Sequence, residues 1–282
     1  MTLISRVIII LLSLSFGHSR EEAFSILFRL ARTISMDDLT NRQTEILKAL
    51  IKEYTESGDA IGSEILEKKY KLGVSPATIR NEMVQLAKKG YLRKEYFSSG
   101  RLPSAKGFRF YIKNLMKEKE LTTTDEVSYK NSIWDDREDL HKLLSHAVKV
   151  LAERTGLLSL AATSGGDLYY AGVGNLLGIQ EFLNLDLSRS LFERLDEMKY
   201  WTKVLDRMNG LPGEIYFMLG EDDFSDPLLE PCASIFGDFI GSNMQGLIGV
   251  VGPKRMQYEV LTPQVKYFSQ LIEDIVKEHE SK

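Results

Sequence analysis

A short stretch of the sequence carries polar side chains of the types that read DNA bases. They are Thr78, Arg80, Asn81 and Gln85, with Ser75 and Ala77 at the start of the stretch. Arginine can form two hydrogen bonds with guanine, asparagine or glutamine can do the same with adenine, and a small apolar residue can contact a thymine methyl group. The set therefore indicates the reading of base pairs in a major groove, provided that one helix presents these side chains together.

The surrounding residues predict such a helix. Ser75 can cap its first turn, and Pro76 then takes the first helical position, where a missing N–H costs nothing. Ile79, Met83 and Leu86 recur at i, i+4 and i+7, so they form an apolar stripe on the other side of the helix. An ordinary amphipathic surface helix has the same pattern, so the flanking segments must decide between the two interpretations.

Two further helices are predicted before this one. The first covers residues 40–57. The second covers residues 64–70, with Ser63 as its cap and with Ile65 and Leu66 facing inward. A short turn that contains a glycine leads from the second helix into the one that carries the polar set. This order is the helix-turn-helix motif.

The segment that follows predicts a wing. Residues 91–97 have the composition of a strand, residues 98–103 form a turn with an exposed arginine, and residues 104–119 return as a helix rich in aromatic and basic residues. A strand and a basic turn directly after a helix-turn-helix can lie on phosphates or reach the minor groove. We therefore expect further DNA contacts, mainly to phosphates, from Ser99, Arg101, Lys106 and Arg109.

The charge distribution favours a polyanion-binding first half. The 282 residues carry a net charge of −4, but residues 36–118 hold 16 Lys and Arg against 11 Asp and Glu, whereas residues 119–282 hold 16 against 27. Within the first half, residues 88–117 hold nine basic residues and one acid, interleaved with aromatic side chains. A solvated surface would explain a charge run alone, but the aromatic residues favour nucleic-acid binding.

Other kinds of chemistry find little support. The single cysteine, Cys232, excludes an intrachain disulfide, and the four histidines show no metal-ligand spacing. An acidic cluster at residues 221–226 could bind a divalent cation, although a solvated loop is the simpler interpretation. No glycine pair has the strand–helix context of a dinucleotide site. We therefore expect no enzyme activity, no cofactor and no metal site.

Residues 137–282 predict a second domain that contains helices and strands. Helices are expected over residues 137–155, 187–208 and 260–279, and strands over residues 157–163, 168–173, 214–219 and 247–251. A glycine turn joins the first two strands into a hairpin. Strands alternating with helices indicate an α+β domain. The polar residues 120–136 predict a linker between the two domains.

Residues 1–35 differ from the rest of the chain. An apolar run of about ten residues, from Val7 to Phe16, is short for a membrane span, and no good signal-peptidase site follows it. A translation start at Met36 would make the extension an artefact or a dispensable segment. We favour that interpretation over a membrane anchor.

The chain resembles the heat-inducible transcription repressor family, HrcA. The resemblance rests on residues 39–43, GVSPATIRNEM at 73–83, GYL at 90–92 and SGRLPSAKGFRFY at 99–111, and continues through residues 174–177, 181–182 and 246–258. It covers residues 37–282 and implies an α+β fold, with an N-terminal winged helix-turn-helix domain followed by a GAF-like α+β domain. The expected parts are an extension over 1–35, the winged helix-turn-helix domain over 36–119, the linker over 120–136 and the GAF-like domain over 137–282.

The resemblance also implies a function. The family represses chaperone genes by binding an inverted-repeat operator called CIRCE, and its active state depends on the GroE chaperonin. For this chain it implies a cytoplasmic repressor that binds double-stranded DNA as a homodimer, with GroE as a partner and no membrane partner. The alternatives are a small-molecule-sensing GAF-like regulator with a winged-helix module, and a winged helix that mediates protein contacts.

One departure from the family affects the expected dimer. In the family, a long stretch with an inserted dimerisation domain precedes the element found here at residues 174–177, whereas in this chain only a short hairpin, about residues 161–171, fills that gap. The apolar stripes of the helices at 137–155 and 260–279 could supply a dimer contact instead. Alternatively, both stripes cover the sheet of their own chain, and pairing occurs only on DNA.

Overall fold

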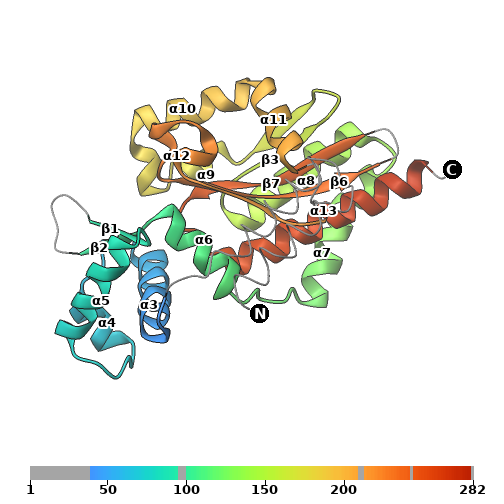
Figure 1. Ribbon diagram of the computed structural model, residues 1–282. Helices are drawn as coiled ribbons and strands as arrows, with labels where there is room; N and C mark the ends of the chain where they lie inside the picture. Colours follow the sequence, from blue (N-terminus) through green and yellow to red (C-terminus); the bar gives the residue numbers. More distant parts are fainter. Residues whose placement is uncertain (1–38, 95–99, 209–212, 242–243, 281–282) are drawn as a thin grey trace, which may run out of the picture. The chain divides into compact units, whose positions relative to one another are not determined.

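The computed structural model describes residues 39–94, 100–208, 213–241 and 244–280 (Figure 1). The chain divides into two compact units, residues 1–44 and 45–282. The described part of the first unit is the start of helix α3 (Asn41–Ser57), where the Gln43 N–H donates to Thr40 Oγ1 at 3.2 Å and the Thr40 N–H donates to Gln43 Oε1 at 3.3 Å. This reciprocal capping fixes the beginning of the helix. The extension predicted over residues 1–35 lies outside the described residues.

The second unit contains most of a winged helix-turn-helix domain. Its elements after α3 are α4 (Ser63–Lys69), α5 (Pro76–Lys88), β1 (Leu92–Lys94), β2 (Arg101–Pro103) and α6 (Ala105–Asn114). β1 and β2 pair antiparallel, and Ile61 forms an additional antiparallel bridge with Arg101. The small sheet of the wing is therefore anchored to the segment between α3 and α4.

The core predicted for α5 is confirmed, but one inward residue of α4 is not. Ile79, Met83 and Leu86 are all buried, and Leu66 of α4 is fully buried as well. Ile65, by contrast, is 40% exposed, so its predicted inward orientation is wrong. Neighbouring residues on a helix point about 100° apart, and a helix of seven residues that buries Leu66 turns Ile65 towards solvent.

The wing and the helix after it differ from their predictions. Residues 98–103 were expected to form a turn, but Arg101–Pro103 pair with β1 as a strand, and Arg101 is half-buried. Helix α6 ends at Asn114 instead of Lys119. Pro263 of a later helix has no N–H, which leaves the Glu259 carbonyl without its helical donor, and the Lys119 N–H donates to that carbonyl at 2.9 Å. The segment after Asn114 thus leaves the helix, and its backbone forms a hydrogen bond with the first turn of the later helix instead.

Gly107 allows the first turn of α6 to lie against the backbone that follows α5. A Cβ at this position would lie 2.3 Å from the Tyr91 carbonyl oxygen, which no side chain could tolerate. The Ser104 N–H donates to the same carbonyl at 3.0 Å, and Ser104 Oγ donates to the Gly90 carbonyl at 2.6 Å. These contacts fix the orientation of the wing strands relative to α5.

The segment predicted as a linker contains ordered helix. α7 (Thr123–Ile133) begins with a capping box in which Thr122 and Asp125 satisfy each other, and a short 3₁₀ turn, η1 (Trp134–Asp136), follows it. Tyr129 and Ile133 are buried, and the Tyr129 ring packs 5.2 Å from that of Phe268. The expectation of a polar linker overlooked these two apolar anchors. The domain boundaries themselves stay a prediction.

The rest of the chain forms a GAF-like domain around one antiparallel sheet. Its strands are β3 (Leu158–Thr163), β4 (Leu168–Ala171), β5 (Tyr216–Leu219), β6 (Cys232–Ile240) and β7 (Gln245–Pro253), in the spatial order β4-β3-β7-β6-β5. Its helices are α8 (Leu140–Thr155), α9 (Val173–Leu176), α10 (Leu185–Asp196), α11 (Met198–Met208), α12 (Glu221–Phe224) and α13 (Tyr258–Glu280), with the 3₁₀ turns η2 (Gln180–Leu183) and η3 (Pro227–Leu229). The expected α+β class is confirmed. The predicted helix over residues 187–208 is broken at Glu197, and the inner strand β6 was not predicted at all.

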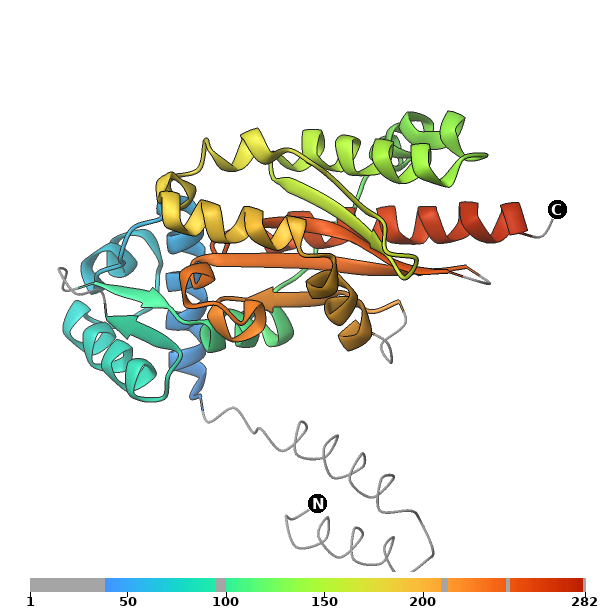
Figure 2. The ribbon, with the colours of Figure 1, turned by 90° about the horizontal axis from the view of Figure 1, so that it is seen from above.

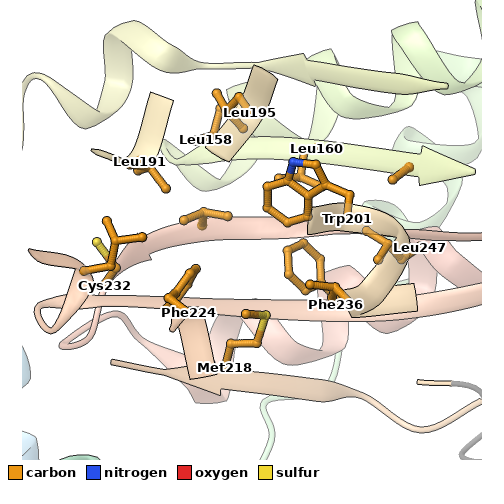
Figure 3. Close-up of a cluster of buried hydrophobic side chains, with 14 of the residues drawn as sticks. Leu158, Leu160, Leu191, Leu195, Trp201, Met218, Phe224, Cys232, Phe236 and Leu247 are labelled. Carbon is orange, nitrogen blue, oxygen red and sulfur yellow. The ribbon is translucent and has the colours of Figure 1, made fainter. Parts of the chain in front are cut away.

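Helices cover both faces of this sheet (Figures 1 and 2). α9 to α12 lie on one face, where Trp201 meets Phe236 edge to face at 5.9 Å among buried leucines (Figure 3). α8 and α13 lie on the other face, packed against β3, β6 and β7. Buried apolar side chains therefore fill two layers, one on each side of the sheet.

The apolar stripes of α8 and α13 were predicted either to form a dimer contact or to cover the sheet of their own chain, and the packing of the second layer distinguishes the two. In α8, Leu144, Val148 and Leu151 of the predicted stripe are buried against the sheet of the same chain, and its fourth residue, Leu140 at the helix start, is exposed. In α13, the predicted inward residues are all buried, namely Val265, Phe268, Leu271, Ile272 and Val276. These stripes cover their own sheet, so the suggestion that they form a dimer contact is corrected.

Candidate DNA interface

Helix α5 begins as the sequence predicts. The Thr78 N–H donates to Ser75 Oγ at 3.3 Å, and the hydroxyl groups of the two residues lie 3.1 Å apart. Pro76 occupies the first position of the helix. The cap fixes the direction in which the first turn leaves the preceding loop, and this turn carries the residues expected to approach DNA.

The predicted base-reading face of α5 is open to solvent. Ser75, Ala77, Arg80, Asn81 and Gln85 are exposed, whereas Thr78 is half-buried beside Ser75. The buried stripe of the same helix faces the domain core, so the polar face has no packing role. The structure thus places these side chains together on one surface, and their contact with DNA stays a prediction.

A basic hollow of about 280 Å³ lies between α5 and the wing. Its walls include Arg80 and Val84 from α5, Lys94 from β1 and Arg101 from β2. The wing strand that carries Arg101 is held by two backbone bonds to Ile61, at 2.9 and 3.0 Å. Three cations from α5 and the two wing strands therefore surround one concave surface, which suits a polyanion. Sequence reasoning missed Lys94, although it lies in the basic run of residues 88–117.

Two further cations predicted to contact DNA, Lys106 and Arg109, do not line the basic hollow and are bonded elsewhere in the chain. Lys106 Nζ donates to the Lys89 carbonyl at 2.9 Å and lies 4.3 Å from the centre of the Tyr91 ring, so it caps the end of α5. Arg109 forms an ion pair with Asp223 of α12, with Nη2 and Oδ2 2.6 Å apart. This ion pair favours a structural role for Arg109, and its contact with DNA stays a prediction. Ser99 lies outside the described residues.

Two carboxylates of the acidic cluster at residues 221–226 form hydrogen bonds within the chain. Besides the ion pair with Arg109, Asp223 Oδ2 accepts the Leu219 N–H at 2.6 Å. Asp226 accepts a hydrogen bond from Ser190 Oγ at 2.5 Å. Within the described ranges, no group of three or more His, Cys, Asp or Glu side chains could hold a metal ion. These carboxylates are bonded inside the domain.

The two bases of the turn after β7 have structural partners too. Lys254 is 2% exposed and pairs with Glu230, which also lies 3.2 Å from Arg93 of β1. Burial lowers the pKa of the Lys254 ammonium, and the facing carboxylate opposes that shift. Arg255 forms a two-point ion pair with Glu181, at 2.5 and 3.0 Å. Arg93, Lys254 and Arg255 thus connect elements of the second unit.

The exposed polar face of α5 and the basic hollow beside it define the chain as a winged-helix protein of the DNA-binding class, with a GAF-like domain after the wing. Residues 38–93 match the description "Winged helix-turn-helix transcription repressor, HrcA DNA-binding", and residues 76–261 match "HrcA protein C terminal domain". The second match alone covers more than half of the chain. The chain belongs to the HrcA family, which is a family of transcription repressors.

Relatives of this chain carry the name heat-inducible transcription repressor HrcA. The one from Clostridioides difficile (strain 630) is 38% identical over 126 residues, which are 45% of this chain and 37% of the relative. The one from Clostridium acetobutylicum (strain ATCC 824) is 35% identical over 144 residues, which are 51% of this chain and 42% of the relative. The matched region thus spans less than half the length of either relative.

One solved structure shares the fold. It is titled "Crystal structure of a hypothetical protein at 2.2 A resolution", is 19% identical, and superposes with a TM-score of 0.72 over 86% of this chain and 100% of that one.

Among the residues that the structure describes here, no helix combines the length and apolar character needed to cross a membrane.

Proposed function

We propose that the chain is a sequence-specific DNA-binding repressor of transcription. Its operator would be an inverted repeat of the CIRCE type upstream of chaperone genes, as the family resemblance implies. The observation that carries the proposal is the exposed polar face of α5 beside the basic hollow formed by Arg80, Lys94 and Arg101. The helix would enter the major groove with Arg80 on its base-reading face, while Lys94 and Arg101 neutralise phosphates.

The proposal includes partners. An inverted repeat presents two half-sites related by a two-fold axis, so two copies of the chain would bind one operator as a homodimer. Because the stripes of α8 and α13 are covered within one chain, we propose that pairing occurs on DNA or through another surface. The GroE chaperonin would support the active state, and the protein would act in the cytoplasm.

Binding to an operator duplex tests this function directly. We expect the full chain to bind a CIRCE-type duplex at least about 1,000-fold more tightly than a scrambled duplex of the same composition at physiological salt. Fluorescence anisotropy would measure both affinities, and sedimentation of the complex would count the chains per duplex. Equal affinities would contradict a sequence-specific repressor. Adding GroE should raise the bound fraction, and no change would remove only the chaperonin from the proposal.

Arg101→Gln is expected to weaken binding to operator and scrambled duplexes alike. A phosphate contact releases a counterion, so its loss should flatten the slope of log K against log salt by about 0.9. Arg109→Gln is the matched control, because the same substitution there removes a cation that does not line the basic hollow and forms an ion pair with Asp223. Anisotropy titrations at several salt concentrations give both slopes. An unchanged slope for Arg101→Gln, or an equal loss for Arg109→Gln, would contradict this division of the basic residues.

A further inference from the structure

A cavity of about 460 Å³ lies beside the edge strand β5. We call it the edge cavity. Three segments line it: α6 with the residues that follow it, residues 213–219 around β5, and the beginning of α13. Ligand-binding pockets in proteins commonly measure about 300–1,000 Å³, so this one could hold a small organic molecule.

Much of the wall of the edge cavity is apolar. The contributing side chains are Ile112, Met116, Ile215, Phe217 and Leu219. Phe217 and Leu219 alternate along β5 and so point to the same face of the sheet, the face that α13 covers. An apolar wall of this kind favours a ligand with a hydrocarbon or aromatic body.

Thr262 supplies a polar group to this wall that the fold leaves unused. It lines the cavity and is 1% exposed, and among the described residues its Oγ1 has no hydrogen-bond partner. Buried hydroxyl groups are nearly always hydrogen-bonded, because an unsatisfied one loses its bonds to water without replacement. A ligand atom that bonds to this hydroxyl would remove that cost.

Lys266 places a positive charge near this hydroxyl. It lies one helical turn after Thr262, so both side chains project from the same side of α13. Lys113 lines the cavity from α6, and neither lysine forms an ion pair within the described part of the chain. A hydroxyl donor and ammonium groups beside an apolar wall are the features that bind a carboxylate on a hydrocarbon tail.

The remaining charged side chains of the edge cavity are a paired arginine and two acids. Arg109 also lines it, but its charge is neutralised by Asp223. Glu118 and Glu214 are exposed, as Lys113 and Lys266 are, so water screens all four charges, whereas the Thr262 hydroxyl is buried. These two acids do raise a specific alternative, a ligand with a positive head group, which can be tested with a probe of that charge.

We propose that the edge cavity binds a small monocarboxylate with an apolar tail. Thr262 Oγ1 donates to the carboxylate, Lys266 neutralises it, and the tail covers Phe217 and Leu219. This site is distinct from the DNA surface on α5 and does not depend on the proposed repressor function. A binding measurement without DNA therefore tests it separately.

Isothermal titration calorimetry of the full chain with sodium octanoate is the test. We expect saturable binding of one octanoate per chain at neutral pH, and no binding of octylamine, which has a tail of the same length and the opposite charge. Thr262→Val removes the hydroxyl while keeping the shape, and Lys266→Ala removes the charge. Each should weaken binding by about tenfold or more. Lys277→Ala is the control, because Lys277 lies on the same helix, pairs with Glu273 and does not line the cavity.

Thermal unfolding separates ligand binding from a structural role for the hydroxyl. Without octanoate, Thr262→Val should melt no lower than the wild-type protein, because the hydroxyl has no partner to lose. Octanoate should raise the melting temperature of the wild-type protein and of Lys277→Ala more than that of the two cavity variants. Absence of saturable octanoate binding, binding of octylamine in its place, or wild-type affinity in both cavity variants would overturn the proposal.

Discussion

Ile79→Asp is expected to unfold the winged helix-turn-helix domain. Ile79 is fully buried on α5, between Met83 and the cap at Ser75 along the same helix. A carboxylate at this position would either lose its hydration without a partner or take up a proton, and each outcome costs several kcal/mol. A loss above about 4 kcal/mol is a large part of the stability of a small domain, about 5–15 kcal/mol.

Hydrogen exchange read by mass spectrometry would locate this effect. In Ile79→Asp, the amides of α3 to α6 should lose protection, while those of β6 and β7 keep theirs. Asn81→Asp is the matched control, since it adds the same acid two residues later on the exposed face. It should change stability by no more than about 0.5 kcal/mol. Full protection of α5 in Ile79→Asp would contradict the buried position of this side chain.

Local signals were sufficient to predict helix α5 and the start of α6 in the winged helix-turn-helix domain. The cap, the proline and the apolar stripe of α5 all act within one helix, so the interactions that start and orient it can be seen in a short stretch of sequence. They involve Ser75, Pro76 and the stripe that starts at Ile79. The same holds for Ser104 at the start of α6. Ile65 was misplaced because the sequence does not show which of two adjacent apolar residues the core takes up, and only the tertiary packing selects Leu66.

Strand β6 could not be predicted from its own residues. Both of its faces are covered by helices, so the period of two that marks a half-exposed strand is absent. It also contains residues that disfavour strands. Gly237 is needed because a Cβ would lie 2.5 Å from Ser269 Oγ on α13, and the buried Asp238 accepts the Gly213 N–H at 2.9 Å. The partners of both residues lie more than 20 positions away in the sequence.

At the candidate DNA interface, too, contacts between residues far apart in the sequence could not be predicted. The run at residues 88–117 predicted a polyanion-binding surface, but composition cannot tell which of its cations are already paired. Arg109 and Asp223 are 114 residues apart, and only the fold brings them together. The basic hollow, conversely, joins Lys94 to Arg80 and Arg101 across the wing. The sequence shows which residues are basic. Only the tertiary structure shows which of them line the basic hollow and which form contacts elsewhere in the chain.

Arg80→Ala and Asn81→Ala are expected to remove most of the preference for operator DNA. Both side chains are exposed near the beginning of α5, the part of a recognition helix that approaches base edges. A bidentate contact of arginine with guanine, or of asparagine with adenine, is worth about 1–3 kcal/mol of discrimination against the wrong base. Neither side chain contributes to the buried stripe, so both variants should keep their fold and melting temperature.

The ratio of affinities for operator and scrambled duplexes separates base reading from phosphate binding. Each variant should lower this ratio by roughly five- to 150-fold, with most of the loss on the operator side. Lys88→Ala is the control, because it removes an exposed cation from the other end of the same helix and should weaken both duplexes equally. If Arg80→Ala and Asn81→Ala behave like this control, the two residues contact phosphates and the bases are read elsewhere. An operator with single base changes would then identify the reader, since only the true contact makes a variant indifferent to the changed base.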